Sequence, residues 1–220
     1  MARCPARAIA AAGFALVVAN GSSTFAARTA LSNADGSYET AYIPREDVLL
    51  PPDYGAFAER YSGTWEVVGV TLEFTQIGIW GGSRHDLFLW LDDGTGSPGS
   101  VLCVRQVDLQ PQPAYWPDCS HYEYSFSPGC CVSGDWWIGA WLVYPGAPTY
   151  YLCSDLTGGA GTTSMIKIPP GLEWPEGWQD VDLVFGPTHA LGIGALVEEC
   201  APTPVEARTW GRVKSLYGRR

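Results

Sequence analysis

The feature of this sequence that most constrains its fold is the alternation of short apolar segments with clusters of Gly, Pro, Ser and Asp. In the segment 65–80 apolar and polar side chains alternate. The apolar residues of one face are Val68, Val70, Leu72 and Phe74, and the polar residues of the other face are Thr71, Glu73 and Thr75. A period of two residues is typical of a strand with one buried face, so we expect a half-buried β-strand here.

Further strands are expected wherever a similar apolar segment is bounded by turn-forming residues. These candidates are 86–91, 101–109, 121–126, 136–144, 149–153, 164–168, 180–186 and 189–198. The composition, with 46% hydrophobic residues, 26 Gly and 17 Pro in 220 residues, supports one packed, turn-rich domain. We predict an all-β fold, a single jelly-roll-like β-sandwich of about eight to ten strands with disulfides, plus a short C-terminal helical tail.

The N-terminal segment 1–26 has the composition of a secretory signal peptide. Two arginines precede an apolar stretch at 8–19, and the small residues Thr24 and Ala26 occupy the positions that a signal peptidase recognises. The stretch is shorter than the roughly 20 residues that cross a bilayer. We expect cleavage after residue 26, no transmembrane span and a secreted or cell-surface protein with its sandwich domain at 27–200. An uncleaved amphipathic anchor is the alternative.

Export also changes the cysteine count. Cys4 is lost with the signal peptide, which leaves an even number of cysteines: Cys103, Cys119, Cys130, Cys131, Cys153 and Cys200. An even number in an exported chain favours disulfides, and no Cys-x-x-Cys pair or Cys/His cluster at zinc spacing competes with that interpretation. The connectivity stays open, but a bridge between adjacent residues is strained, so Cys130 and Cys131 are expected to have different partners.

Charge is divided unevenly along the chain. The net charge of −10 combines +3 over 1–28, −17 over 29–205 and +4 over 206–220. Nucleic acid is not expected as a partner, because affinity for a polyanion comes mainly from Lys and Arg. No cofactor is expected either, and the oligomeric state stays open.

The sequence offers no strong catalytic or metal-binding motif. It lacks Gly-x-Ser-x-Gly, and His85 and Asp86 are adjacent, so they point to opposite faces of a strand. We interpret both as solvated polar residues at a strand start. Asp92 and Asp93, followed by glycine, are a weak calcium candidate, but the same residues favour a tight turn, which we prefer.

Tryptophan is the most informative residue type for binding. Trp137 and Trp141 fall on one face of the predicted strand 136–144, while Trp174 and Trp178 flank a Pro/Gly turn. Exposed indoles can stack on sugar rings, whereas indoles between two sheets fill the core. We expect most of them in the core, and we predict these four, with Trp174 and Trp178 first, as candidates for a glycan-binding surface.

The C-terminal segment consists of a Pro-containing spacer at 201–208 and a basic tail at 209–220. Apolar residues of the tail fall on one side of a short helix, which is marginal alone and needs a surface to lie on. We predict an amphipathic targeting tail. Its characteristic residues are Trp210, Gly211, Lys214, Leu216 and Tyr217.

Several segments together resemble a family of secreted bacterial proteins of uncharacterised function. They are DGSYETAY at 35–42, PPDYGAFAERY at 51–61, LDDGTGSPGSVL at 91–102, GPTHALGIGA at 186–195 and TWGRVKSLY at 209–217. Members resemble one another in a signal peptide, one β-sandwich-like domain and a terminal Thr-Trp-Gly-x-Ile/Val-Lys-x-Leu-Tyr tail. The resemblance implies export and architecture, and it carries no catalytic residue to this chain.

The combined expectation is an exported, non-catalytic β-sandwich module that binds a glycan or another cell-surface component. A structural or adhesive subunit that assembles with copies of itself is the first alternative. A hydrolase with a carboxylate site is the second.

Overall fold

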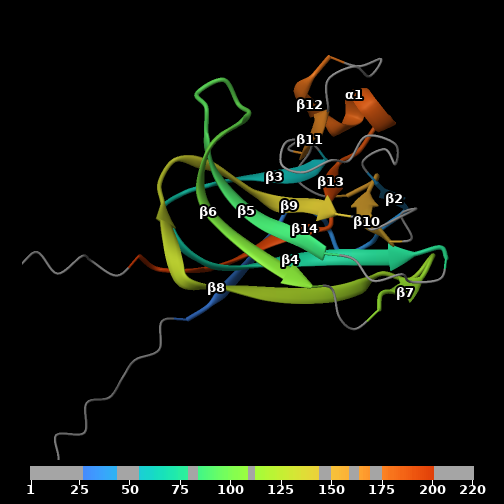
Figure 1. Cartoon of the computed structure of the whole chain (residues 1–220), viewed down its shortest axis with the longest axis horizontal. Helices are drawn as coiled ribbons and strands as arrows, with labels where there is room; N and C mark the ends of the chain where they lie inside the picture. Colours follow the sequence, from blue (N-terminus) through green and yellow to red (C-terminus); the bar gives the residue numbers. More distant parts are fainter. Residues whose placement is uncertain are drawn as a thin grey trace, which may run out of the picture.

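The computed structural model describes residues 27–43, 55–78, 84–108, 112–143, 150–158, 164–168 and 175–200. In this part of the chain two β-sheets pack face to face (Figure 1). The predicted signal peptide, the spacer, the targeting tail and Trp174 lie outside the described residues.

The strands have the following bounds. The first sheet contains β1 (Thr29–Ser32), β2 (Thr40–Tyr42), β4 (Trp65–Gln76), β7 (Ala114–Tyr115), β8 (Ser120–Val132), β10 (Tyr150–Asp155), β13 (Ala190–Leu191) and β14 (Ile193–Glu198). The second contains β3 (Ala56–Ser62), β5 (Arg84–Asp92), β6 (Pro98–Asp108), β9 (Asp135–Val143), β11 (Ser164–Ile168) and β12 (Gly177–Asp180). The helix α1 (Val181–Phe185) follows β12.

The order of the main strands is that of a jelly roll. It is β1-β14-β4-β8 in one sheet and β3-β9-β5-β6 in the other, and all of these neighbours are antiparallel. In the first sheet the first strand of the chain, β1, pairs with the last, β14, and β4 and β8 follow beside them. In the second sheet β3 pairs with β9, and β5 and β6 follow. The chain therefore crosses repeatedly between the two sheets. The predicted all-β sandwich with disulfides is therefore confirmed.

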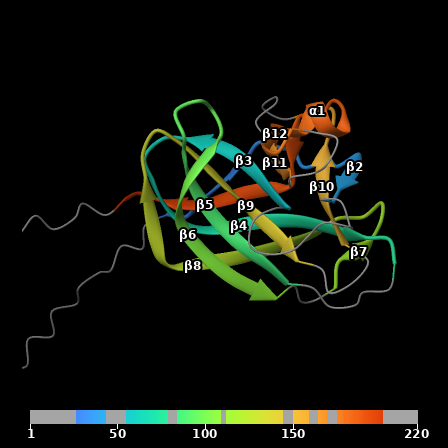
Figure 2. The same ribbon diagram turned by 45° about the horizontal axis from the view of Figure 1, so that its top comes forward.

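One end of the sandwich carries the extra elements. There β10, β13 and β2 extend the first sheet, β11 and β12 extend the second, and α1 lies beside them (Figures 1 and 2). The segment 180–186 was predicted as a strand, and this is wrong for most of it. Val181 and Val184 both face the core, which is the spacing of one helical turn, while Leu183 is 59% exposed. A helix of five residues is too short to show a period in sequence.

The alternation predicted around β4 holds, with one shift. Val70, Leu72 and Phe74 are fully buried between the sheets, but Val67 and not Val68 joins them. A register shift in the β4–β8 pairing between Val67 and Gly69 marks a β-bulge. A bulge adds one residue to a strand and so reverses the faces of the residues before it.

A buried carboxylate ties four segments together at the centre of the sandwich. Glu59 of β3 has no exposed surface. Its Oε1 accepts hydrogen bonds from the Ser164 hydroxyl and from the Leu191 backbone N–H at 2.7 Å, and its Oε2 accepts one from the Asn33 amide at 2.8 Å. Matched donors are required because a buried charge without partners is strongly unfavourable. Glu59 thus connects β3 to β11, to β13 and to the segment after β1.

His85 is buried in the core, and its interpretation as a solvated residue is wrong. Its side chain has no exposed surface, and neither ring nitrogen has a hydrogen-bond partner. The ring packs against Phe74 at 5.4 Å and Tyr124 at 5.1 Å between centroids. Burial lowers the pKa of His85 to about 3. Asp86 points to the outer face, as the strand alternation predicts, and lies opposite Trp141.

Replacing Glu59 tests its role in stability. Glu59→Gln keeps the shape of the side chain but replaces one acceptor oxygen by an NH2 group, which is a donor and faces other donors. We therefore expect the free energy of unfolding to fall by about 2 kcal/mol or more. Urea denaturation followed by tryptophan fluorescence measures it. The exposed Glu176→Gln is the matched control, with an expected change below about 0.5 kcal/mol. Equal midpoints for E59Q and the wild type would contradict the role.

The buried imidazole predicts a specific acid sensitivity. Between pH 6.5 and 3 the unfolded chain binds a proton at His85 and the native state does not, so stability is lost as the pH falls. The slope is about 1.4 kcal/mol per pH unit. His85→Phe removes this contribution, so its stability relative to the wild type should rise by about 2 to 3 kcal/mol from pH 7.5 to pH 4.5 in urea titrations. A difference that stays constant with pH would refute the assignment.

Candidate functional site

The tryptophans predicted for binding lie mostly in a second apolar cluster on the outer face of the six-stranded sheet. Trp137 and Trp141 share that face of β9, as predicted, but they are only 2% and 7% exposed. Trp178 is half-buried and belongs to the strand β12, not to a turn. The other members of the cluster are Ala56, Ala58, Phe88, Trp90 and Met165.

Cations cover this outer aromatic cluster. The Lys167 ammonium lies 5.4 Å from the Trp141 ring centroid and 5.7 Å from that of Trp178. The Arg60 guanidinium lies 5.9 Å from the Trp137 ring and pairs with Asp92 and Asp135. Such cation–π contacts stabilise a covered ring. The cluster therefore offers little open aromatic surface.

The Asp92–Asp93 segment forms the tight turn between β5 and β6. Asp92 accepts from the Gly94 N–H at 2.8 Å and from the Trp137 indole at 3.0 Å, and Asp93 accepts from the Thr95 N–H at 2.7 Å. Although burial raises the pKa of Asp92, these hydrogen bonds lower it overall. Within the described ranges no three His, Cys, Asp or Glu residues are placed to hold a metal ion. The carboxylates thus act as turn acceptors.

Exposed aromatic side chains of the described residues lie elsewhere: Phe185 on α1, and an adjacent pair where β7 ends and its connection to β8 begins. In this pair Tyr115 is 60% exposed and Trp116 is 38% exposed, and Ile77, which directly follows β4, is 62% exposed. Large apolar side chains on a surface loop require an explanation, because loops held on a rigid scaffold often carry binding residues. Sequence reasoning missed this pair.

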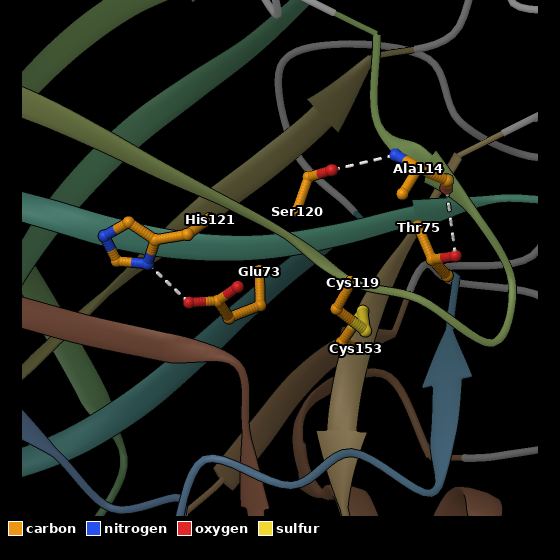
Figure 3. Close-up of a disulfide and its surroundings, with 7 residues drawn as sticks. All are labelled: Glu73, Thr75, Ala114, Cys119, Ser120, His121 and Cys153. Atoms are coloured by element: carbon orange, nitrogen blue, oxygen red, sulfur yellow. Dashed lines mark hydrogen bonds and ion pairs between the residues drawn. A yellow bond between two sulfur atoms is a disulfide. The ribbon is translucent and has the colours of Figure 1, made fainter.

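A network of hydrogen bonds fixes this loop to β4. The strand β7 pairs in parallel with Thr75 and Gln76, whose side chains donate to the Ala114 carbonyl at 3.3 Å and the Pro113 carbonyl at 2.6 Å. The Ser120 hydroxyl accepts from the Ala114 N–H at 2.8 Å (Figure 3). Both ends of the loop are therefore held.

A disulfide anchors the same loop to the neighbouring strand. Cys119 is bonded to Cys153 of β10, with Cα atoms 6.5 Å apart (Figure 3). A second disulfide joins Cys103 of β6 to Cys130 of β8 and so links the two sheets. Two disulfides of the predicted set are thus confirmed, and Cys130 is bonded to a partner other than Cys131, as expected.

A pocket of about 340 Å³ opens beside the loop on the outer face of the first sheet. Its lining residues come from the segment after β1, from β4 and from the loop: Gly36, Tyr38, Glu73, Pro117, Asp118 and Cys119. Trp116 directly precedes the lining residue Pro117. The pocket thus combines carboxylates with a phenol, and the chain segment that carries the exposed rings leads directly into its wall.

Two larger depressions differ from this pocket. One, of about 640 Å³, lies between β1 and β3, and one, of about 670 Å³, lies beside the Cys103–Cys130 disulfide. Their aromatic lining residues, Tyr61 and Phe126, are each 7% exposed and belong to the core. Neither depression therefore presents an open aromatic ring.

Glycine at position 192 allows Glu73 to take its place in the pocket. A Cβ at Gly192 would lie 2.6 Å from the Cβ of Glu73. The Gly192 carbonyl accepts from the Glu73 N–H at 2.8 Å, and its own N–H donates to the Cys153 carbonyl at 2.7 Å. This close approach joins β4, β10 and the β13–β14 junction behind the pocket.

The pocket's polar groups are electrically coupled. The Nδ1 of His121 lies 2.5 Å from the Oε1 of Glu73 (Figure 3). Burial alone lowers the pKa of His121, but the hydrogen bond and charge of Glu73 raise it overall. Burial first, and then nearby carboxylates with Glu73 foremost, raise the pKa of Tyr38. Tyr38 therefore keeps its hydroxyl proton, and Glu73 acts as an anchored acceptor.

The arrangement suits recognition of hydroxyl groups. Carboxylate oxygens accept hydrogen bonds, the Tyr38 hydroxyl donates and accepts them, and exposed rings contact apolar ring faces.

Titration of His121 tests its coupling to the pocket residue Glu73. In Glu73→Gln the opposing charge is gone, so we expect the pKa of His121 to fall toward or below 6.5, the ordinary value for histidine. Two-dimensional NMR of the histidine ring protons against pH measures it. Glu123→Gln, which removes the more distant partner at 3.4 Å, serves as the control and should produce a smaller decrease. A larger decrease in E123Q than in E73Q would reverse the assignment.

Comparison with known proteins gives one limited similarity. No family model and no solved structure matches the chain. It is similar to Exostosin-like 1 of Mus musculus, with 28% identity over 124 residues. The matched region covers 53% of this chain and 16% of the mouse protein, so the chain spans less than a fifth of that relative's length. The similarity assigns neither a family nor an activity.

Proposed function

We propose that this chain is an exported, non-catalytic β-sandwich module that binds glycans at the loop between β7 and β8. The observation that carries the proposal is the pair of exposed rings, Tyr115 and Trp116, beside a pocket that Tyr38, Glu73 and Asp118 line. Small-molecule sites combine apolar or aromatic surface with a few fixed polar groups in this way. The loop is held before binding, which lowers the entropy cost of association.

The charge of the site selects among glycans. Glu73 and Asp118 line the pocket, and the segment 29–205 carries a net charge of −17. Sulfated or uronic-acid-rich chains would be repelled, whereas sugar hydroxyls donate readily to carboxylates. The ligand class is therefore a neutral glycan with free hydroxyl groups.

Export is the second part of the proposal. Two disulfides in the described residues support an oxidising compartment. In the part of the chain that the structure describes, no helix has the length and apolar character to cross a membrane. The signal peptide at 1–26 and the targeting role of 209–220 stay predictions from sequence.

A second candidate function is self-assembly through an edge strand. Among the described strands β6 pairs with β5 alone, and its exposed side chains include Val101 at 52%, Leu102 at 40% and Val104 at 57%. An apolar edge strand is a template for pairing with another chain. Sedimentation velocity over a range of concentrations distinguishes the candidates, because assembly through β6 is concentration-dependent and glycan binding by a monomer is not.

Substitution of the exposed rings tests the glycan site. After an array of neutral and sulfated glycans has identified a ligand, we expect Trp116→Ala and Tyr115→Ala each to weaken its binding at least tenfold in calorimetry, about 1.4 kcal/mol. Both side chains are exposed, so the thermal midpoint should change little. Preferential binding of sulfated glycans would contradict the proposed ligand class.

Trp178→Ala is the matched control, because it removes the same side chain from the outer aromatic cluster of the other sheet. We expect unchanged affinity in this variant. Loss of binding in W178A together with full binding in W116A would show that the glycan binds to the six-stranded sheet instead.

A further inference from the structure

Two cysteines of the described chain take no part in the two disulfides. Cys131 is exposed at the end of β8, and Cys200 is partly buried two residues beyond the end of β14. Cys131 directly follows Cys130, whose sulfur is already bonded to Cys103 on the inner side of the sheet. Because side chains alternate along a strand, Cys131 faces the outer side of the eight-stranded sheet.

The strand register places the two cysteines on the same face of the eight-stranded sheet, on either side of Glu66 in β4. On β4, Glu66 lies opposite Cys131 of β8 on one side and opposite Glu198 of β14 on the other. Residues two apart in an extended chain share a face, so Cys200 continues the side of Glu198. The Cys200 thiol lies within hydrogen-bonding reach of the Cys131 thiol.

The surroundings of the two thiols differ. Burial, followed by the neighbouring Cys131 and the charge of Glu66, raises the pKa of the Cys200 thiol to about 11. Cys200 is therefore a weak nucleophile toward an external disulfide, while the exposed Cys131 is the sulfur that such a reagent reaches first.

We propose that Cys131 and Cys200 form a third disulfide in the exported protein. The oxidant is a small-molecule or protein disulfide of the export compartment, of which oxidised glutathione is the simplest representative. The Cys131 thiolate attacks one glutathione sulfur, which forms a mixed disulfide and releases one glutathione thiolate. The Cys200 thiolate then attacks the Cys131 sulfur and releases the second glutathione. Two protein thiols and one glutathione disulfide thus become one protein disulfide and two glutathione thiols.

The bond has a defined structural consequence. It joins the end of β8 to the chain beyond β14 across the outer face of β4, so three neighbouring strands are held at one end. All six cysteines of the segment 27–200 are then paired. The bond also fixes the position from which the residues 201–220 continue.

Alkylation of the full chain tests the proposal without any substitution. The protein is secreted by an expression host, unfolded in guanidinium chloride without reductant and treated with iodoacetamide. Its intact mass is then measured by mass spectrometry. We expect no carbamidomethyl group on Cys131 or Cys200. Labelling of both would overturn the proposal, and so would a digest that links Cys200 to any cysteine other than Cys131.

Peptide mapping shows which segments are joined, and fragmentation of the peptide 106–167, which contains Cys119, Cys130, Cys131 and Cys153, identifies the bonded cysteine within it. Trypsin cuts after Arg84, Arg105, Lys167 and Arg208, so Cys103, Cys131 and Cys200 fall in three different peptides. Without reductant the three peptides should elute as one linked species. In Cys200→Ser the peptide 168–208 should separate while 85–105 stays linked, and one thiol should become reactive. Cys103→Ser is the matched control, in which 85–105 separates and 168–208 stays linked.

Discussion

Pairing along β4 is the interaction on which the first sheet depends. This strand pairs with β14 and β10 on one side and with β8 and β7 on the other. Its inward residues, such as Leu72 and Phe74, enter the core, and its outward residues face the surface. Because the outward set begins with Glu66 and includes Glu73, the same strand lies under the two remaining thiols at one end and under the pocket beside the β7–β8 loop at the other. The period of two thus links the core to both surface features.

Buried polar groups divide into two kinds in this sandwich. Glu59 is surrounded by donors from three other segments, so its burial specifies how those segments meet. The ring nitrogens of His85 have no hydrogen-bond partner and the ring stays neutral, so it behaves as an aromatic core residue. It lowers the stability of the native state only at acidic pH. The two residues show opposite solutions to the same problem, because a buried charge needs partners and a neutral ring needs only packing.

Much of the fold was predictable from alternation and turn residues, but the site was not. The strand at 65–76 follows a period of two, and the strands at 136–143 and 193–198 are apolar segments bounded by turn residues. The strand β3 was missed, because Glu59 occupies a core position that sequence reasoning assigns to an apolar residue. Tryptophan content pointed to glycan binding, yet Trp137 and Trp141 are covered by cations from other strands. A signal for the loop of the proposed site existed in the adjacent Tyr115 and Trp116 beside proline and cysteine.

The sequence by itself determined the all-β class, the single sandwich and the use of cysteines as disulfides, because these follow from side-chain period, turn residues and cysteine number. Only the tertiary structure decided which aromatic rings are exposed, which cysteines are partners and which polar side chains are buried. Each of these depends on a residue distant in sequence: Lys167 over Trp141, Cys153 on Cys119, and Ser164 on Glu59. Local patterns report the face of a strand on which a residue lies, and the fold decides what lies against that face.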